Sequence, residues 1–197
     1  MRLFVGLGNP GARYAGNRHN IGFMAITRLA EVHRASPWRS KFQGDVAEVR
    51  LGSDKLILLR PTTYMNESGR SVQEAARFFQ LGLDRITVFH DELDLAFGRV
   101  RVKVGGGHAG NNGIRSIAGH MGPDFQRVRL GIGHPGHKDL VSHYVLSDFS
   151  KAERAYVDDL VDAVAGAAPK LCAGDPPGFL NEVALKCPAP KPEKSPE

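Results

Sequence analysis

The sequence predicts a single-domain α/β fold of three layers, in which a central mixed, mostly parallel sheet is flanked by helices. Short apolar segments typical of buried strands alternate with amphipathic segments typical of helices, and turns rich in Gly or Pro separate them. The chain has 197 residues, which suits one compact domain with its own core. We expect this domain to span residues 1–186, and the Pro-, Lys- and Glu-rich residues 187–197 to form a disordered tail.

The elements expected in the first half begin with a buried strand over Arg2–Leu7, an apolar run that Gly and Pro end. A polar, glycine-containing loop then delays the next element, an amphipathic helix over Asn20–His33 with one apolar stripe. Two strands over 45–51 and 55–60, joined by a short turn, and a helix over about 67–80 complete this half.

In the second half, an apolar strand over 85–90 leads into the acidic turn Asp91–Asp94. Arg99–Val104 alternates basic and apolar residues, which predicts a half-exposed strand with a basic face. The remaining expected elements are a glycine-rich loop over 105–113, a helix over 114–121, a strand over 128–132 and helical segments over about 140–144 and 151–168.

The charge of the chain favours an anionic partner such as nucleic acid. Its 26 Lys and Arg residues exceed its 21 Asp and Glu residues, giving a formal net charge of +5. Between residues 99 and 129 the only acid is Asp124, and the basic residues there are Arg99, Arg101, Lys103, Arg115, Arg127 and Arg129.

No apolar run is long enough for a membrane helix, and the N-terminal apolar run stops at Asn9-Pro10, too early for a signal peptide. Cys172 and Cys187 form no C-x-x-C pair, which favours two free thiols in a reducing compartment. We therefore expect a cytoplasmic protein.

Residues Gly6–Gly11 fit the G-x-G-x-x-G pattern of dinucleotide-binding proteins, and Glu31 lies 20 residues beyond. The helix should then start at the turn, but Pro10 and the polar run after it delay the helix to about residue 19 or 20. The favoured interpretation is that the glycines let the strand turn sharply, so that Asn9 and Tyr14 face a pocket at the sheet edge.

His19 lies at the start of that helix, where the positive end of the helix dipole disfavours a protonated ring. A neutral ring can accept a proton, as a general base must. His90–Asp94 would by itself indicate a solvated turn. If its strand lies beside the first strand, one of its carboxylates can orient His19, as in many hydrolases.

Two further segments offer amide side chains for binding. In Pro61–Gly69, Asn66 or Ser68 could simply cap a helix, or Met65 and Asn66 could lie in a cleft where the amide binds peptide groups. The glycine-rich loop allows close backbone approach and ends in Asn111 and Asn112, which suit an amide-containing ligand.

His134 and His137 flank a Pro-Gly turn and have no third ligand at a recognisable spacing, so we expect no metal site.

Six motifs occur in the order GLGNPG with Tyr14, RHNIGF, PTTYMNESG, HDELDL, KVGGGHAGNNGIRS and RLGIGHPG. Together they resemble the bacterial peptidyl-tRNA hydrolase family from Met1 to about Glu182. The resemblance implies a metal-independent carboxylic ester hydrolase without a cofactor. It would act as a monomer on peptidyl-tRNA, releasing free tRNA for reuse in translation.

The resemblance also implies residue roles. His19 is the general base on water, Asp91 orients it, and Asn9 helps to fix His19 or the ribose end. The implied binding residues are Asn9, Asn66 and Asn112 for the peptide and ester, Tyr14 and Met65 for the cleft, and Lys103 and Arg129 for tRNA phosphates.

The chain departs from the family at Asn111, where the family commonly has a histidine. Two alternatives remain open at this stage: a non-catalytic RNA-binding protein using the same basic face, and a metal-dependent hydrolase. The His19–Asp91 pair, kept together with Asn9, Asn66 and Asn112, counts against a purely binding role, because binding alone would not require it.

Overall fold

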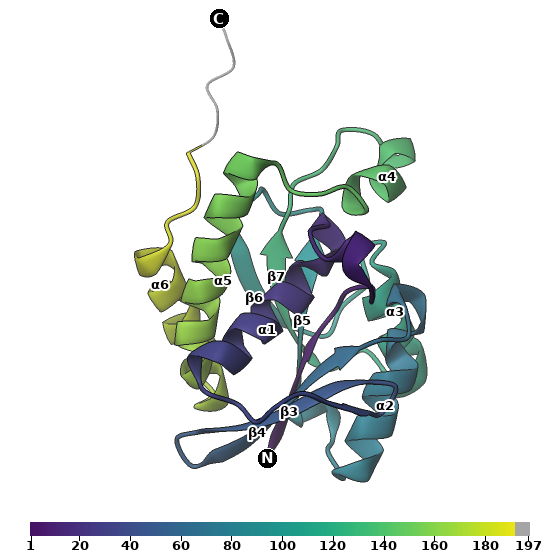
Figure 1. Ribbon diagram of the computed structural model, residues 1–197, viewed down its shortest axis with the longest axis vertical. Helices are drawn as coiled ribbons and strands as arrows, with labels where there is room; N and C mark the ends of the chain where they lie inside the picture. Colours follow the sequence, from purple (N-terminus) through teal and green to yellow (C-terminus); the bar gives the residue numbers. More distant parts are fainter. Residues whose placement is uncertain (192–197) are drawn as a thin grey trace, which may run out of the picture.

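The computed structural model of the chain, described for residues 1–191, is built on one sheet of seven strands in the order β2-β3-β4-β1-β5-β7-β6 (Figure 1). The four central strands β4, β1, β5 and β7 pair in parallel, and the strands outside them are antiparallel. The expected mixed, mostly parallel sheet is confirmed. The strands are β1 (Arg2–Gly6), β2 (Arg39–Lys41), β3 (Gly44–Leu51), β4 (Asp54–Pro61), β5 (Ile86–Glu92), β6 (Val100–Val104) and β7 (Gln126–Gly131).

Helices cover both faces of the sheet, which confirms the three layers. Figure 1 shows α5 and α6 on one side of the sheet and α2 and α3 on the other, and α1 packs with the first pair. The long helices are α1 (Ile21–Val32), α2 (Ser68–Phe78), α3 (Asn112–Met121), α5 (Lys151–Cys172) and α6 (Pro176–Lys186). Short helical segments are η1 (Ala12–Tyr14), η2 (Arg18–Asn20), η3 (Met65–Glu67), η4 (Leu83–Arg85), η5 (Lys138–Leu140) and α4 (Val141–Val145).

The central strand β1 supplies side chains to both layers, because successive residues point to opposite faces. Phe4 belongs to the core beneath α1 and α5, whereas Leu3 and Val5 belong to the core beneath α2 and α3. All three side chains are fully buried. An apolar run without alternation is what a strand covered on both faces requires.

The start of α1 packs closely against the ends of β1 and β5. A Cβ added at Gly22 would lie 2.3 Å from the carbonyl oxygen of Phe89, so no larger residue fits there without a shift. The Phe23 amide also donates to the carbonyl of Leu7, at 3.1 Å. This close approach places η2, which precedes α1, over the end of β5.

Helix α5 runs four residues beyond the expected end at Ala168, through Pro169. A proline inside a helix leaves the carbonyl four residues earlier without its usual donor. Here that carbonyl belongs to Ala165, and His33 Nε2 donates to it at 2.7 Å from α1. The neighbouring helix therefore supplies the hydrogen bond that the proline removes.

The C-terminal segment leaves the domain later than expected. Cys187, placed in the predicted tail, is buried, and the Tyr156 hydroxyl donates to the Pro188 carbonyl at 2.9 Å. The first residues of this segment thus lie against α5, while the rest of the predicted tail, residues 192–197, lies outside the described residues. Within residues 1–191, no helix is both long and apolar enough to cross a membrane.

Candidate active site

His19 and Asp91 meet where the start of α1 crosses the end of β5. His19 Nδ1 lies 2.7 Å from Asp91 Oδ2, although the two residues are 72 positions apart in the chain. The Asp91 side chain is 2% exposed and the His19 side chain 12% exposed. The strand pairing that the sequence analysis required, β1 beside β5, is present and brings the two together.

Two opposing effects set the pKa of His19. Burial lowers it, whereas the charge of Asp91 and the hydrogen bond to Asp91 raise it, and the net shift is upward from the ordinary value of 6.5. The positive end of the helix dipole also disfavours the protonated ring. The adjacent carboxylate outweighs these unfavourable effects, so the pKa of His19 lies above that of a free imidazole.

The same contact fixes the tautomer of the neutral ring. A carboxylate oxygen only accepts, so Nδ1 carries the hydrogen and Nε2 is left as the acceptor. His19 and Asp91 line a cavity of about 90 Å³ together with residues from the glycine-rich loop and α4. A cavity of this size has room for water beside the ring.

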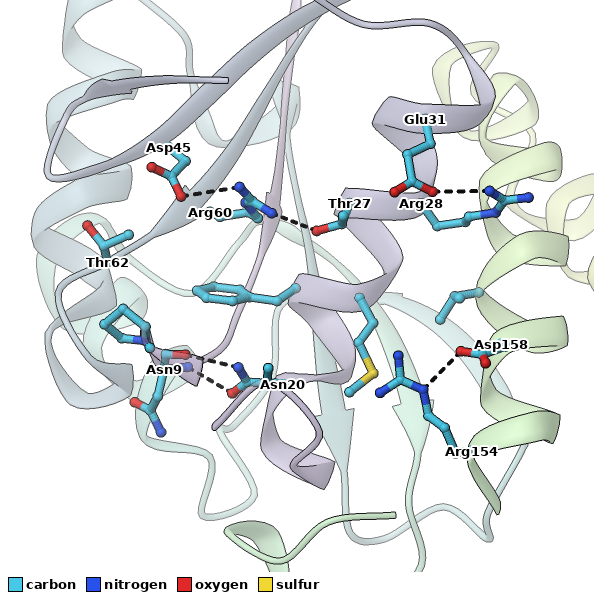
Figure 2. Close-up of a pocket in the computed structure, with 16 residues that line it drawn as sticks. Asn9, Asn20, Thr27, Arg28, Glu31, Asp45, Arg60, Thr62, Arg154 and Asp158 are labelled. Carbon is cyan, nitrogen blue, oxygen red and sulfur yellow. Dashed lines mark hydrogen bonds and ion pairs between the residues drawn. The ribbon is translucent and has the colours of Figure 1, made fainter. Parts of the chain in front are cut away.

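Asn9 is held at the turn after β1 by three hydrogen bonds. Its amide donates to Asn20 Oδ1 and its carbonyl accepts from Asn20 Nδ2, both at 2.9 Å (Figure 2). Its side-chain oxygen accepts from the Met65 amide at 2.8 Å. Because Oδ1 is bound to the Met65 amide, the orientation of the Asn9 side-chain amide is fixed.

Asn66 and Asn112, two of the residues expected to bind the substrate, line one cavity of about 440 Å³ between η3 and α3. Asn112 also lines the small cavity that contains His19. Asn112 thus lies between the His19–Asp91 pair and the larger cavity.

The residues expected to line a cleft differ in exposure. Met65 is 4% exposed and lies beneath Gly113, in the core under α2 and α3. Tyr14 makes an edge-on contact with Tyr64, their ring centroids 6.4 Å apart. Tyr64 was not singled out from the sequence, yet it is 55% exposed and has a φ of 63°, which is uncommon for an aromatic residue.

The basic segment divides into exposed and buried charges. Arg99, Arg101 and Arg115 are exposed, whereas Arg127 is 1% exposed and donates to the carbonyls of Gly106, Gly107 and Pro123. Arg127 therefore holds the glycine-rich loop in place.

The two predicted phosphate-binding residues are neighbours on β6 and β7. Arg129 Nε donates to Glu92 Oε1 at 2.9 Å, so this residue is ion-paired in the structure. Burial lowers the pKa of Lys103, and the nearby charges of Arg129 and Arg127 lower it further. A cluster of like charges that the protein does not fully neutralise favours an anionic ligand.

Arg18, the residue before His19, was not singled out from the sequence. It donates to Ser147 Oγ at 2.7 Å and to the Asp148 carbonyl at 2.8 Å, pairs with Glu153 at 2.8 Å, and lies over the Tyr144 ring. These contacts hold the segment that follows α4 against the start of α1. Helix α4 itself lines the small cavity beside His19. No pattern local to Arg18 could reveal partners 129 or more positions away.

A separate cavity of about 460 Å³ lies along α1, on another side of Asn9 and Asn20 (Figure 2). Figure 2 shows three arginines at its rim, and each is paired with a carboxylate. The pairs are Arg28–Glu31, Arg60–Asp45 and Arg154–Asp158. Each arginine at the rim is therefore neutralised by a carboxylate of the protein. In this respect the cavity differs from the basic segment, where basic residues outnumber acidic ones.

The two histidines considered as metal ligands act as local turn acceptors. His134 Nδ1 accepts from the Gly136 amide at 3.0 Å, and His137 Nδ1 accepts from the Asp139 amide at 3.1 Å. Over residues 1–191, no group of three or more His, Cys, Asp or Glu side chains has the arrangement of a metal site.

Comparisons with known proteins agree on one family. The sequence profile of the peptidyl-tRNA hydrolase family matches residues 3–190. The chain is 62% identical to the peptidyl-tRNA hydrolase of Dinoroseobacter shibae, covering 97% of this chain and 81% of the relative. It is 63% identical to that of Methylobacterium nodulans, covering 94% and 91%. A crystal structure of peptidyl-tRNA hydrolase from Acinetobacter baumannii superposes with a TM-score of 0.89 at 40% identity, covering 96% and 97%.

Proposed function

The chain belongs to the peptidyl-tRNA hydrolase family and hydrolyses peptidyl-tRNA, and we propose that His19 is the general base of this reaction. The observation that carries the proposal is the 2.7 Å contact between His19 Nδ1 and the buried Asp91 carboxylate. It leaves Nε2 as the proton acceptor beside a cavity with room for water.

In the proposed reaction, His19 Nε2 takes a proton from water while the water oxygen attacks the ester carbonyl carbon. The bond to the ribose oxygen then breaks, and the proton returns from His19 to that oxygen. The products are the peptide carboxylic acid and the free 3′ end of tRNA. Asp91 stabilises the protonated ring during the step and keeps it oriented.

Substrate selection is assigned to the three asparagines. Asn66 and Asn112 would bind the peptide backbone in their shared cavity, and Asn9 Nδ2 would donate at the ribose end of the ester. An N-acylated substrate satisfies amide groups that a free aminoacyl group, with its ammonium, leaves unpaired. Leaving such groups unpaired costs about 1–3 kcal/mol each.

The tRNA would lie across β6, β7 and the start of α3. Lys103 and Arg129 would contact phosphates, with Arg99, Arg101 and Arg115 adding long-range attraction. We also propose that the protein acts as a monomer in the cytoplasm. One chain supplies His19, Asp91 and the asparagines, and peptidyl-tRNA is a product of translation.

The test compares N-acetyl-aminoacyl-tRNA with unacetylated aminoacyl-tRNA, in the presence of EDTA, for the wild type and His19→Ala. We expect the wild type to release tRNA rapidly from the acetylated substrate alone, and His19→Ala to lose this activity. Rapid hydrolysis by His19→Ala would contradict the assigned base. Loss of wild-type activity in EDTA, restored by added metal, would contradict the metal-independent mechanism.

A further inference from the structure

The site contains one side chain that the family's motif does not explain, Asn111, which stands where the family commonly has a histidine. Its side-chain oxygen accepts from the amides of Gly113 at 3.0 Å and Ile114 at 3.1 Å, so it caps the N-terminus of α3. Because the oxygen faces the helix, the orientation of the amide group is determined, and Nδ2 must point away from α3.

The Nδ2 group points at the catalytic carboxylate. It donates to Asp91 Oδ1 at 3.0 Å and lies 3.3 Å from the Asp91 main-chain oxygen. Asp91 Oδ2 is meanwhile occupied by His19. Each carboxylate oxygen therefore has its own partner, one from η2 and one from the N-terminus of α3, and rotation of the carboxylate would break both contacts.

We propose that Asn111 is a positioning residue for the hydrolysis, holding Asp91 in the orientation in which its other oxygen binds His19. The inference rests on the proposed role of His19. Asn111 lines the same small cavity as His19, but its Oδ1 caps α3 and its Nδ2 donates to Asp91, so we infer that it acts through Asp91. It would therefore affect turnover and leave substrate binding largely unchanged.

The choice of an amide has a consequence for pH. A histidine at this position could gain a proton near the pH at which His19 does, and the two ionisations would be coupled. An amide donates the same hydrogen bond without titrating. We infer that in this chain the rise of the rate with pH follows the ionisation of His19 alone.

The other ionisable groups around Asp91 fit this inference. His90, on the same strand, is 3% exposed, and burial lowers its pKa, whereas the pKa of His19 is raised. Its Nδ1 lies 2.8 Å from the Asp91 main-chain oxygen. Glu92 is paired with Arg129 from β7. The residues of α4 that line the cavity, Val141, Ser142 and Val145, carry no charge.

Two substitutions separate positioning from capping, because Ser and Asp cap helices about as well as Asn. Asn111→Ser keeps an oxygen for the cap but removes the donor to Asp91. Asn111→Asp also keeps the cap and places a second carboxylate beside Asp91. Asp175→Ala is the matched control, since it removes the cap of α6, which Asp175 provides through Gly178.

The measurements are kcat, KM and the pH–rate profile on N-acetyl-aminoacyl-tRNA, with the thermal midpoint of each variant. Asn111→Ser is expected to lower kcat about 10-fold with little change in KM or thermal midpoint, as loss of a partner that orients a functional side chain typically does. Asn111→Asp should lower kcat as well, and its rate midpoint should move to higher pH because the added charge favours protonated His19. Asp175→Ala should lower only the thermal midpoint.

Wild-type kcat and pH profile in both Asn111 variants, with His19→Ala inactive, would overturn the positioning role and leave Asn111 as a helix cap. Adding Asn111→Ser to His19→Ala should cause no further loss, because the two act through one path. A full additional 10-fold loss would also overturn the proposal. An active His19→Ala enzyme would instead contradict the proposed function itself.

Discussion

The His19–Asp91 pair and the basic segment of this protein differ in burial and in how their charges are arranged. His19 and Asp91 are nearly buried, and a single short contact joins them. The six basic residues lie on or beside β6, β7 and α3, and three of them, Arg99, Arg101 and Arg115, are exposed to solvent. Chemistry that depends on one fixed geometry should be lost with one side chain. Binding that depends on summed charges should weaken by small steps and respond to salt.

The largest effect is expected at His19. A positioned general base contributes about 100- to 10,000-fold, so His19→Ala should lower kcat at least about 100-fold. Affinity for tRNA, measured by filter binding, should stay near the wild-type value because the basic segment is intact. A kcat of His19→Ala within a few-fold of the wild-type value would contradict the expectation that the reaction depends on this one side chain.

Asp91→Asn should have the next largest effect, about 10- to 100-fold in kcat, because the ring loses the charge that stabilises its protonated form. The pKa of His19 should fall, since burial then acts without the opposing carboxylate. In the proposed mechanism the neutral ring is the active form, so the rate should rise as pH increases through this pKa. The midpoint of the pH–rate profile should therefore move to lower pH in the variant. A midpoint at or above that of the wild type would contradict this account of the pair.

Arg127→Ala tests whether this buried basic residue stabilises the fold, in contrast to the exposed basic residues of the segment. Its guanidinium group is buried against three carbonyl oxygens, so its loss should lower the free energy of unfolding by about 2–4 kcal/mol. Urea denaturation measures this change. A variant as stable as the wild type would show that Arg127 does not hold the glycine-rich loop.

Lys103→Ala should produce the smallest effect. Loss of one phosphate contact should reduce the slope of log affinity against log salt by about one, with little change in stability. Lys55→Ala is the matched control, because Lys55 has the same charge but lies on β4 and pairs with Glu48. Equal slopes for Lys103→Ala and the wild type would place the tRNA elsewhere.

Much of this arrangement could be predicted from the sequence, because it depends on local patterns. Fully apolar runs identified β1 and β5, and ordered motifs drew attention to His19 and Asp91. Strand β2 could not be predicted, since Arg39–Lys41 has no apolar pattern and exists through its pairing with β3.

Several other features that could not be predicted from the sequence depend on distant partners. Helix α5 continues through Pro169 because His33 supplies a hydrogen bond from another helix. The contacts of Arg18 with Ser147, and of Asn111 with Asp91, likewise join separate segments. The upward pKa of His19 was missed for the same reason, because the helix terminus is local and the carboxylate is not.

Whether His19 is the general base can be decided by measuring its ionisation and the pH dependence of the reaction on the same enzyme. The ring of His19 is titrated by NMR, its resonance assigned by the His19→Ala spectrum, and the midpoint is compared with that of kcat/KM against pH, which reports the free enzyme. The account predicts one shared midpoint above about 6.5, and a shared shift to lower pH in Asp91→Asn. A rate midpoint that differs from the His19 titration, or that stays in place when the titration moves in Asp91→Asn, would contradict it.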